Sequence, residues 1–182
     1  PKALQQLEKI VKQVLDDQKF PFVLGGEHSI TIGAIRPFLK KYDNLILLHF
    51  DAHADLRNGY HGEHYSHASA IRRCLDQANL KVVSVGIRNI SAEEIPFVEE
   101  NRERIRIYWG KDKKKWDIDE IVSHLKDLPI YLTFDVDGFD SSVMPATGTP
   151  EPGGLFWQDV IEIITAASQV GTIVGADINE LA

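Results

Sequence analysis

The chain has 182 residues, of which 26% are charged and 43% are hydrophobic, and its net charge is -7. This length supports one α/β domain, and the negative charge excludes a general nucleic-acid binder, which would be basic. No apolar stretch reaches the roughly 18 residues of a membrane span, so we expect neither nucleic acid nor membrane as a partner.

Helix-like and strand-like segments alternate along the chain. Apolar residues three or four positions apart indicate helices, and short apolar runs indicate strands. We expect helices over 1–19, 29–41, 66–78, 92–101, 118–126 and 157–169. We expect strands over 22–24, 45–50, 81–87, 105–109, 130–134 and 172–178, so that the two kinds alternate along the chain. We expect the strand over 22–24 to be buried. This order predicts a parallel sheet flanked by helices in a single domain over 1–182. The chain lacks an initial Met and stops just after a strand-like run, so we expect a fragment that is incomplete at both ends.

Polar side chains cluster where four of the predicted strands end. Ligands of open α/β sheets bind beyond the carboxyl ends of the strands, so these clusters should meet at one edge. Residues two apart in an extended chain point to the same side, so Asp51, His53 and Asp55 can face one point. Asp135 and Asp137 can do the same.

With His28, this edge would contain four carboxylates and two imidazoles. Buried carboxylates repel one another unless cations compensate them, and two divalent ions supply +4 against -4. Ligands rich in oxygen favour Mn²⁺, although the order of metal affinities also allows Zn²⁺, Co²⁺ or Ni²⁺. We therefore expect two Mn²⁺ per chain.

Seven segments resemble the motifs of the ureohydrolase family, which includes agmatinase, arginase, guanidinobutyrase and formimidoylglutamase. They are GGEHS (25–29), DAHAD (51–55), YSHA (65–68), GIR (86–88), FDVDGFD (134–140), PATGTPEPGG (145–154) and GADINE (175–180). They occur in the family's order and span nearly the whole chain. The resemblance implies a three-layer α/β/α sandwich around a parallel sheet, as in arginases and deacetylases.

The resemblance also implies a role for each matching residue. His28 and Asp55 would bind one ion, His53 and Asp137 the other, and Asp51 and Asp135 would bridge the two. His67 would shuttle protons and Glu180 would receive the substrate guanidinium. Asp177 would support the ligands, and Thr147 and Thr149 would line the active-site wall.

These roles suit the hydrolysis of a guanidinium group to urea and an amine. Water held between two divalent ions loses a proton near pH 7, which supplies hydroxide, and Glu180 can hold two guanidinium N–H groups. The amine leaves only when protonated, and a histidine suits that proton delivery. His61 and His64 lie on the same loop as His67, so either could be the shuttle instead.

The segments that recognise an α-amino acid in arginases differ here. Arg57 stands where arginases have an Asn, and Ser91 stands where an Asp is expected, while Glu94 remains acidic. We therefore expect a small cationic guanidino substrate, with agmatine first. Guanidinobutyrate, whose carboxylate could meet Arg57, and free guanidine are alternatives, as are the arginase and formimidoylglutamase substrates.

Two other hypotheses remain open at this point. One is an inactive metal-binding subunit of an oligomer, and the other is a deacetylase, which would bind about one Zn²⁺ rather than two ions. The resemblance implies a homo-oligomer, either a trimer or a hexamer. Cys74 is the lone cysteine, which excludes an intrachain disulfide and fits the reducing cytoplasm.

Overall fold

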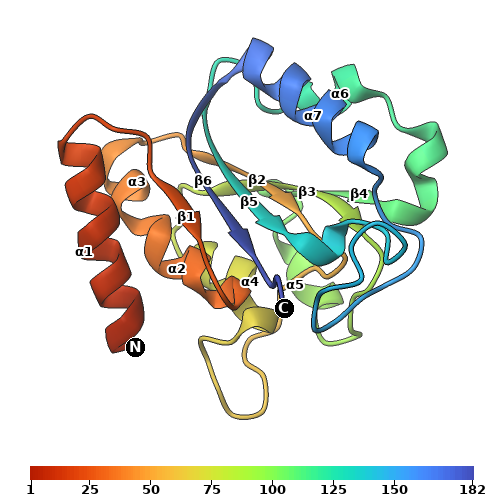
Figure 1. Cartoon of the computed structure of the whole chain (residues 1–182), viewed down its shortest axis with the longest axis horizontal. Helices are drawn as coiled ribbons and strands as arrows, with labels where there is room; N and C mark the ends of the chain where they lie inside the picture. The colour runs from red at the N-terminus through yellow and green to blue at the C-terminus, as the bar shows by residue number, and fades with distance from the viewer.

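The computed structural model describes residues 1–182, which form a parallel sheet between two layers of helices (Figure 1). The strands are β1 (Phe22–Leu24), β2 (Ile46–Phe50), β3 (Lys81–Ile87), β4 (Ile105–Trp109), β5 (Pro129–Asp135) and β6 (Thr172–Asn179). They lie in the order β1-β6-β5-β2-β3-β4, and every neighbouring pair is parallel. All carboxyl ends therefore meet at one edge, and the expected three-layer fold is confirmed.

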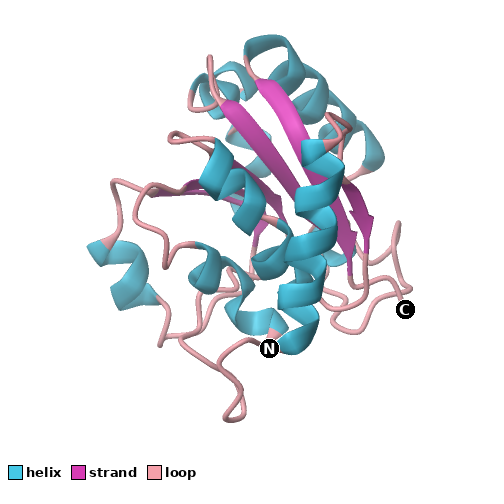
Figure 2. Ribbon diagram, turned by 90° about the vertical axis from the view of Figure 1, so that its left-hand side faces the viewer, coloured by secondary structure: helices cyan, strands magenta, loops and turns pink.

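Seven α-helices cover the two faces of the sheet (Figure 2). One face packs against the helices α1 (Lys2–Asp16), α2 (Thr31–Ala34), α3 (Arg36–Lys41), α4 (Ala70–Cys74) and α5 (Ile95–Glu100). The other face packs against α6 (Ile118–Ser123) and α7 (Trp157–Val170). None of these helices is long and apolar enough to cross a bilayer.

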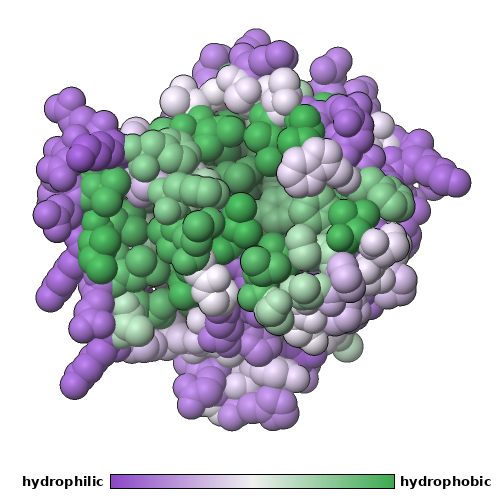
Figure 3. Space-filling model, viewed as in Figure 1, coloured by the Kyte–Doolittle hydropathy of each residue, from purple (hydrophilic) through white to green (hydrophobic).

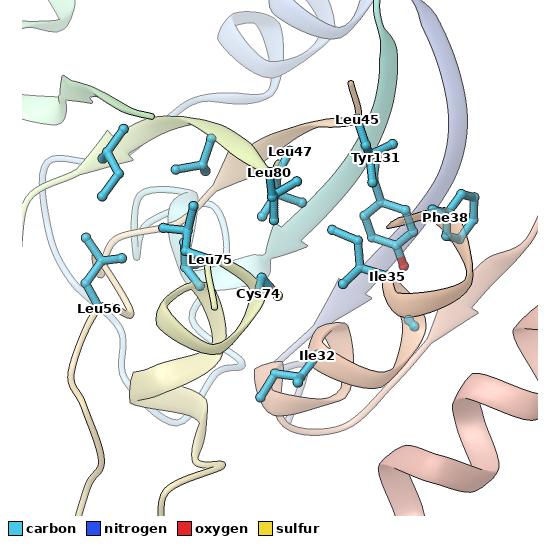
Figure 4. Close-up of a cluster of buried hydrophobic side chains, with 14 of the residues drawn as sticks. Ile32, Ile35, Phe38, Leu45, Leu47, Leu56, Cys74, Leu75, Leu80 and Tyr131 are labelled. Atoms are coloured by element: carbon cyan, nitrogen blue, oxygen red, sulfur yellow. The ribbon is translucent and has the colours of Figure 1, made fainter. Parts of the chain in front are cut away.

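The central strand β2 shows why the sheet is buried on both sides. Successive side chains of a strand point to opposite faces. Leu47 joins the core under α1 to α4, whereas Leu48 and Phe50 join the core under α6 and α7. Figure 4 shows the first core, in which Tyr131 of the sheet lies beside Ile35 and Phe38 of the helical layer.

Three expectations about the elements need correction. The strand Phe22–Leu24 exists but is not buried, because β1 is an edge strand in which Phe22 is 53% and Leu24 is 74% exposed. On the side of the molecule seen in Figure 3, apolar side chains gather between α1 and α7. The helix expected over 29–41 is divided into a 3-10 turn η1 (His28–Ile30), α2 and α3, with Pro37 in the first turn of α3. Proline lacks the N–H that a continuous helix needs.

The helix expected over 66–78 is shorter than predicted. It consists of the 3-10 turn η2 (His67–Ser69) followed by α4, which ends at Cys74. Two further 3-10 segments were not expected: η3 (Gly110–Lys115) and η4 (Val136–Gly138). Since η2 and η4 contain His67 and Asp137, these short turns matter more for the site than the longer helices do.

Candidate metal centre

A cavity of about 220 Å³ opens at the carboxyl edge of the sheet. Its walls come from the loops that follow β2, β3, β5 and β6, as expected for a parallel sheet. The lining residues are His53, Ala54, Asp55, Arg57, Tyr60, His67, Ala68, Asn89, Ser91, Glu94, Asp135, Thr149 and Glu180. The floor thus contains several predicted metal ligands, and the wall contains His67 and Glu180.

The floor comprises the predicted ligands in the cavity lining and those packed directly behind them, and one half of it is centred on His28. Its Nδ1 atom lies 3.1 Å from Oδ2 of Asp51, 3.1 Å from Oδ2 of Asp55 and 3.4 Å from Oδ2 of Asp135. The His28 side chain is fully buried. Ligand atoms that share one ion, each roughly 2.1 Å from it, lie roughly 3 Å apart, so this group has the spacing of a metal site.

The other half is centred on His53. Its Nδ1 atom lies 3.0 Å from Oδ2 of Asp137 and 3.5 Å from Oδ1 of Asp51. Asp51 therefore presents one carboxylate oxygen to the His28 group and the other to the His53 group. This is the arrangement of a carboxylate that bridges two ions.

The chain reaches this arrangement by a different route from the one expected. Asp137 does not continue an extended strand, because it lies in η4, where its backbone N–H donates to Oδ1 of Asp135 (2.9 Å). Asp55 adopts a left-handed backbone with φ 53°. Sparsely populated backbone of this kind occurs often at functional sites. The residues meet because the chain turns sharply after each strand.

Gly138 allows the two ligand segments to approach closely. A Cβ atom at this position would lie 2.9 Å from the backbone N of Asp51 and 3.2 Å from its Cα. Only glycine fits at such a distance without a shift of the backbone. The GFD part of the FDVDGFD motif therefore helps to bring Asp135 and Asp137 against the end of β2.

The charges of the cage shift the pKa values of its members. Burial alone would lower the pKa of His28, but the carboxylates of Asp135, Asp51 and Asp55 raise it well above its ordinary value. Burial first, and then the charge of Asp51, raise the pKa of Asp135 to about 8 and that of Asp55 to about 6. In the metal-free protein these groups hold protons in the positions where cations would bind.

The hydrogen bonds behind His28 show that the cage fits a metal. Thr133 donates its O–H to Oδ1 of Asp177 (2.6 Å), so its oxygen accepts from Nε2 of His28 (2.9 Å). With one hydrogen held on Nε2, the ring can release its proton at Nδ1 and offer that lone pair to an ion among the carboxylates. That buried Nδ1 atom has no hydrogen-bond partner of its own. A cation among the carboxylates would satisfy it.

Asp177 lies behind the cage and outside the cavity. It is fully buried and accepts hydrogen bonds from Tyr131 (2.7 Å) and the Asn179 amide (2.7 Å) as well as from Thr133. Its position is that of the supporting residue expected from the sequence. Its contact with the cage runs through Thr133, which accepts from His28.

His67 lies on the cavity wall at the start of η2. Its Nδ1 atom lies 2.7 Å from Oε1 of Glu27, and its backbone N–H donates to the same oxygen (3.2 Å). Because a carboxylate only accepts, Nδ1 donates its hydrogen, which leaves Nε2 for a ligand. His61 and His64 are not among the lining residues, and His64 is hydrogen-bonded to Arg73. Among the three loop histidines, the cavity geometry favours His67.

Glu180 also lines the cavity, just beyond the end of β6. Its backbone is left-handed, with φ 64°, and its N–H donates to the carbonyl of Gly26 (2.8 Å). One carboxylate oxygen accepts from the backbone N–H of His28 (2.6 Å). Glu180 is thus held beside the cage, where its carboxylate can face a cation.

The loop 145–154 closes one side of the site. Thr149 donates its O–H to Oδ2 of Asp137 (2.9 Å) and lines the cavity. Thr147 is buried, does not line the cavity and has an unpaired hydroxyl. The structure therefore places Thr149 against a predicted ligand and places Thr147 behind the wall.

Three further polar residues shape the site, although the sequence motifs gave them no role. Arg88 donates to the carbonyls of Asp137 (2.7 Å) and Glu151 (2.7 Å), which ties two site loops together. Glu94 accepts from the backbone N–H groups of Leu56 (2.8 Å) and Ser91 (2.7 Å). Glu27 orients His67. Glu27 and Arg88 stand inside quoted motifs, which was the available signal, but their partners are distant in sequence.

Comparisons of the sequence with known proteins all point to one family. The family model described as "Arginase family" matches residues 1–182. The agmatinase of Bacillus subtilis (strain 168) is 35% identical over 184 residues, which is 100% of this chain and 62% of that protein. The N(1)-aminopropylagmatine ureohydrolase of Thermococcus kodakarensis is 38% identical over 180 residues, which is 94% of this chain and 59% of that protein.

Solved structures resemble the fold closely. The agmatine ureohydrolase of Thermoplasma volcanium superposes with a TM-score of 0.86 at 36% identity, over 100% of this chain and 60% of that one. The arginase of Bacillus caldovelox superposes with a TM-score of 0.83 at 26% identity, over 99% and 67%. The chain thus spans about three fifths of the length of the curated relatives it matches.

Proposed function

The chain belongs to the arginase family, and from this membership we propose that the intact protein hydrolyses a guanidino compound, most readily agmatine, to urea and an amine. One observation supports this proposal above the others. Asp51 presents its two carboxylate oxygens to two separate groups, each containing one histidine and at least one further aspartate. A hydrolase that uses two metal ions needs a bridging ligand of this kind.

We propose two Mn²⁺ per chain as the resident ions. His28 and Asp55 would hold one ion and His53 and Asp137 the other, with Asp51 and Asp135 between them. Asp135 has the less symmetric place, because its Oδ2 faces His28 while its Oδ1 accepts from the N–H of Asp137. Bound divalent ions would supply a hydroxide nucleophile near neutral pH.

Glu180 would bind the substrate guanidinium. Its carboxylate lies on the cavity wall next to the cage, and a guanidinium ion can donate two parallel N–H groups to one carboxylate. Such a contact would fix the guanidinium carbon above the floor of the cavity. Positioning of this kind contributes to the rate because the reacting atoms are already held in the geometry of attack.

His67 would transfer the proton that the leaving amine requires. When the carbon–nitrogen bond breaks, the electron pair goes to the nitrogen, and His67, once protonated at Nε2 as well as at Nδ1, supplies the Nε2 proton from the cavity side. Glu27 would keep the ring in this orientation through Nδ1, 2.7 Å away. A base held by a third group is the usual arrangement of such proton-transfer residues.

The cavity lining favours a cationic substrate. Apart from the proposed metal ligands, its lining contains two carboxylates, those of Glu94 and Glu180, against one guanidinium, that of Arg57. Arg57 and Ser91 replace residues that would recognise an α-amino acid. Agmatine, which lacks the α-carboxylate, fits these features better than arginine.

A second candidate substrate is N(1)-aminopropylagmatine, because two relatives, 38% and 34% identical, bear its name. Guanidinobutyrate remains an alternative through Arg57. Urea release from a panel of these compounds and arginine, with Mn²⁺ and the intact protein, would test the proposal. Agmatine or its aminopropyl derivative should give the highest kcat/KM. No urea from any of them, with two ions bound, would instead support a non-catalytic subunit.

We also propose that the protein is a cytoplasmic homo-oligomer, either a trimer or a hexamer. The lone, buried Cys74 fits a reducing compartment, and the oligomer is proposed from the family resemblance. The molar mass of the intact protein by light scattering would test the oligomer, and a monomer would refute it.

A further inference from the structure

His49 is a fully buried histidine that touches the predicted metal cage from behind. It lies in β2, two residues before Asp51, and its neighbour across the sheet is Ser84 of β3. Its Nε2 atom lies 2.8 Å from Oδ2 of Asp51, and its Nδ1 atom lies 3.0 Å from Oγ of Ser84. Both ring nitrogens therefore have a partner.

The partners determine where the hydrogen atoms lie. A carboxylate oxygen only accepts, so Nε2 of His49 donates to Asp51. A neutral ring then has a lone pair at Nδ1, which accepts the hydroxyl hydrogen of Ser84. The contact to Asp51 is thus a directed hydrogen bond from a ring that Ser84 holds in place.

The opposite oxygen of Asp51 is held in a similar way. Its Oδ1 accepts from the backbone N–H of His53 (2.6 Å). Each carboxylate oxygen consequently has one fixed donor, and its other lone pair is left for the cage. Oδ2 faces Nδ1 of His28 (3.1 Å), and Oδ1 faces Nδ1 of His53 (3.5 Å).

We infer that His49 is a positioning residue of the binuclear centre, which holds the bridging carboxylate of Asp51 so that each of its oxygens faces one ion. This inference rests on the proposed metal centre. Metal-binding side chains are commonly oriented by hydrogen bonds from behind, and loss of such a partner weakens metal binding about 10–100-fold. Here the oriented ligand is shared, so both ions should be affected.

The competing possibility is that His49 is itself a ligand, because its Nε2 lies within reach of both His28 and Asp51. Binding an ion through Nε2 would break its hydrogen bond to Asp51. The two roles make different demands on a substitute. A positioning residue needs only an N–H donor at the place of Nε2, which the amide of glutamine can supply.

The test uses the intact protein and Mn²⁺ as the probe. Bound Mn²⁺ per chain and its affinity are measured by equilibrium dialysis, and coupling between the ions by electron paramagnetic resonance. The variants are His49→Leu, His49→Gln and Ser84→Ala. His124→Leu is the matched control, because His124 is hydrogen-bonded to Tyr108 and lies outside the cage.

We expect wild type and His124→Leu to bind two coupled ions. His49→Leu should bind Mn²⁺ about 10–100-fold more weakly and lose the coupling, yet reach two ions at high concentration. His49→Gln should restore most of the affinity, and Ser84→Ala should lower it about threefold to tenfold. The restoration by glutamine is an effect that a purely packing role would not show.

Several outcomes would overturn the inference. Wild-type affinity and coupling in His49→Leu would overturn it, as would unchanged affinity in Ser84→Ala. If His49→Leu does not fold, Ser84→Ala alone tests the inference. If His49→Leu and His49→Gln both stop at one ion in saturating Mn²⁺, His49 is a ligand instead. Fewer than two ions in wild type would refute the proposed centre and this inference together. Two ions bound with wild-type affinity and coupling in every variant would refute this inference alone.

Discussion

The floor and the wall of the cavity are built in different ways. On the floor, His28 is 0% exposed and its neighbours are carboxylates at the ends of β2 and β5. On the wall, the side chain of His67 is 43% exposed and belongs to a loop. The floor is fixed by sheet register and buried hydrogen bonds, whereas the wall depends on loop contacts. Metal binding should therefore reside in the floor, whereas substrate binding, proton transfer and substrate choice should reside in the wall.

Of the changes considered, loss of the Asp51 charge should have the largest effect on the floor. Asp51→Asn keeps the shape of the side chain but removes the charge shared by both halves of the floor. We expect urea release to fall roughly a thousandfold or more, and bound Mn²⁺ to fall from two ions per chain to one or none. Asp112→Asn is the control, because Asp112 pairs only with the exposed Lys115. Two tightly bound ions in Asp51→Asn would show that Asp51 is not the bridge.

Removing the wall histidine should slow turnover without loss of metal. His67→Ala should lower kcat roughly 100- to 1,000-fold, because the leaving amine loses its proton donor. Bound Mn²⁺, measured by atomic emission, should stay at two ions per chain. His61→Ala and His64→Ala should retain nearly full activity. An equal loss in His64→Ala would move the shuttle to that residue.

Metal binding by the floor should also depend on pH. Burial and the Asp51 charge raise the pKa of Asp135 to about 8 and that of Asp55 to about 6, so the metal-free floor holds protons that an ion must displace. Mn²⁺ affinity should therefore rise between about pH 6 and 8, by up to tenfold per pH unit for each proton released.

The stability of the metal-free protein should change with the opposite sign. Groups whose folded pKa is raised bind more protons in the native state than in the unfolded chain, so the free energy of unfolding falls as pH rises through the raised values. Calorimetric titration in buffers of different ionisation enthalpy measures the protons released. Thermal unfolding without metal measures the stability. A rise in metal-free stability from pH 6 to 8 would contradict these pKa shifts.

A change at Glu27 tests how much turnover depends on the orientation of the His67 ring. Glu27→Gln keeps an acceptor for Nδ1 of His67 but removes the charge, so kcat should fall about tenfold while KM changes little. Ser29→Ala is the matched control, because Ser29 donates to the other oxygen of Glu27 (2.9 Å) and does not touch His67. An equal change in both variants would mean that Glu27 acts only on the local fold.

Arg57 should have the smallest effect, confined to substrate choice. Its guanidinium lies 5.4 Å from the centre of the Tyr60 ring, and its pair with Glu93 is long, at 3.4 Å. Arg57→Ala should raise the ratio of kcat/KM for agmatine to that for guanidinobutyrate about threefold to tenfold, since partly exposed charges contribute little. An unchanged ratio would remove Arg57 from substrate recognition.

The proximity of the floor residues could be predicted from the sequence better than that of the wall residues, for a physical reason. An apolar run followed by Asp51 or Asp135 is a local pattern, and parallel strands bring such ends together whatever the loops do. The order of the elements and the parallel sheet flanked by helices followed from the spacing of apolar residues, and the three-layer sandwich was implied by the family resemblance. The exposure of β1 could not be predicted, because its place at the sheet edge depends on strand order.

The turns and the supporting residues were harder to predict. Asp137 reaches the cage through the 3-10 turn η4 and not through an extended strand, and the helix before Lys41 is broken near Pro37. Glu27 meets His67 across 40 positions, and Arg88 meets Asp137 across 49. Such partners are set by tertiary packing, which no short spacing encodes.

The most direct test of the proposed centre is anomalous diffraction at the manganese edge from crystals of the intact, Mn²⁺-loaded protein. The account predicts two ions in the floor of the cavity, one bound by Nδ1 of His28, the other by Nδ1 of His53, and both contacted by Asp51. A single ion, or two ions of which only one touches Asp51, would contradict it.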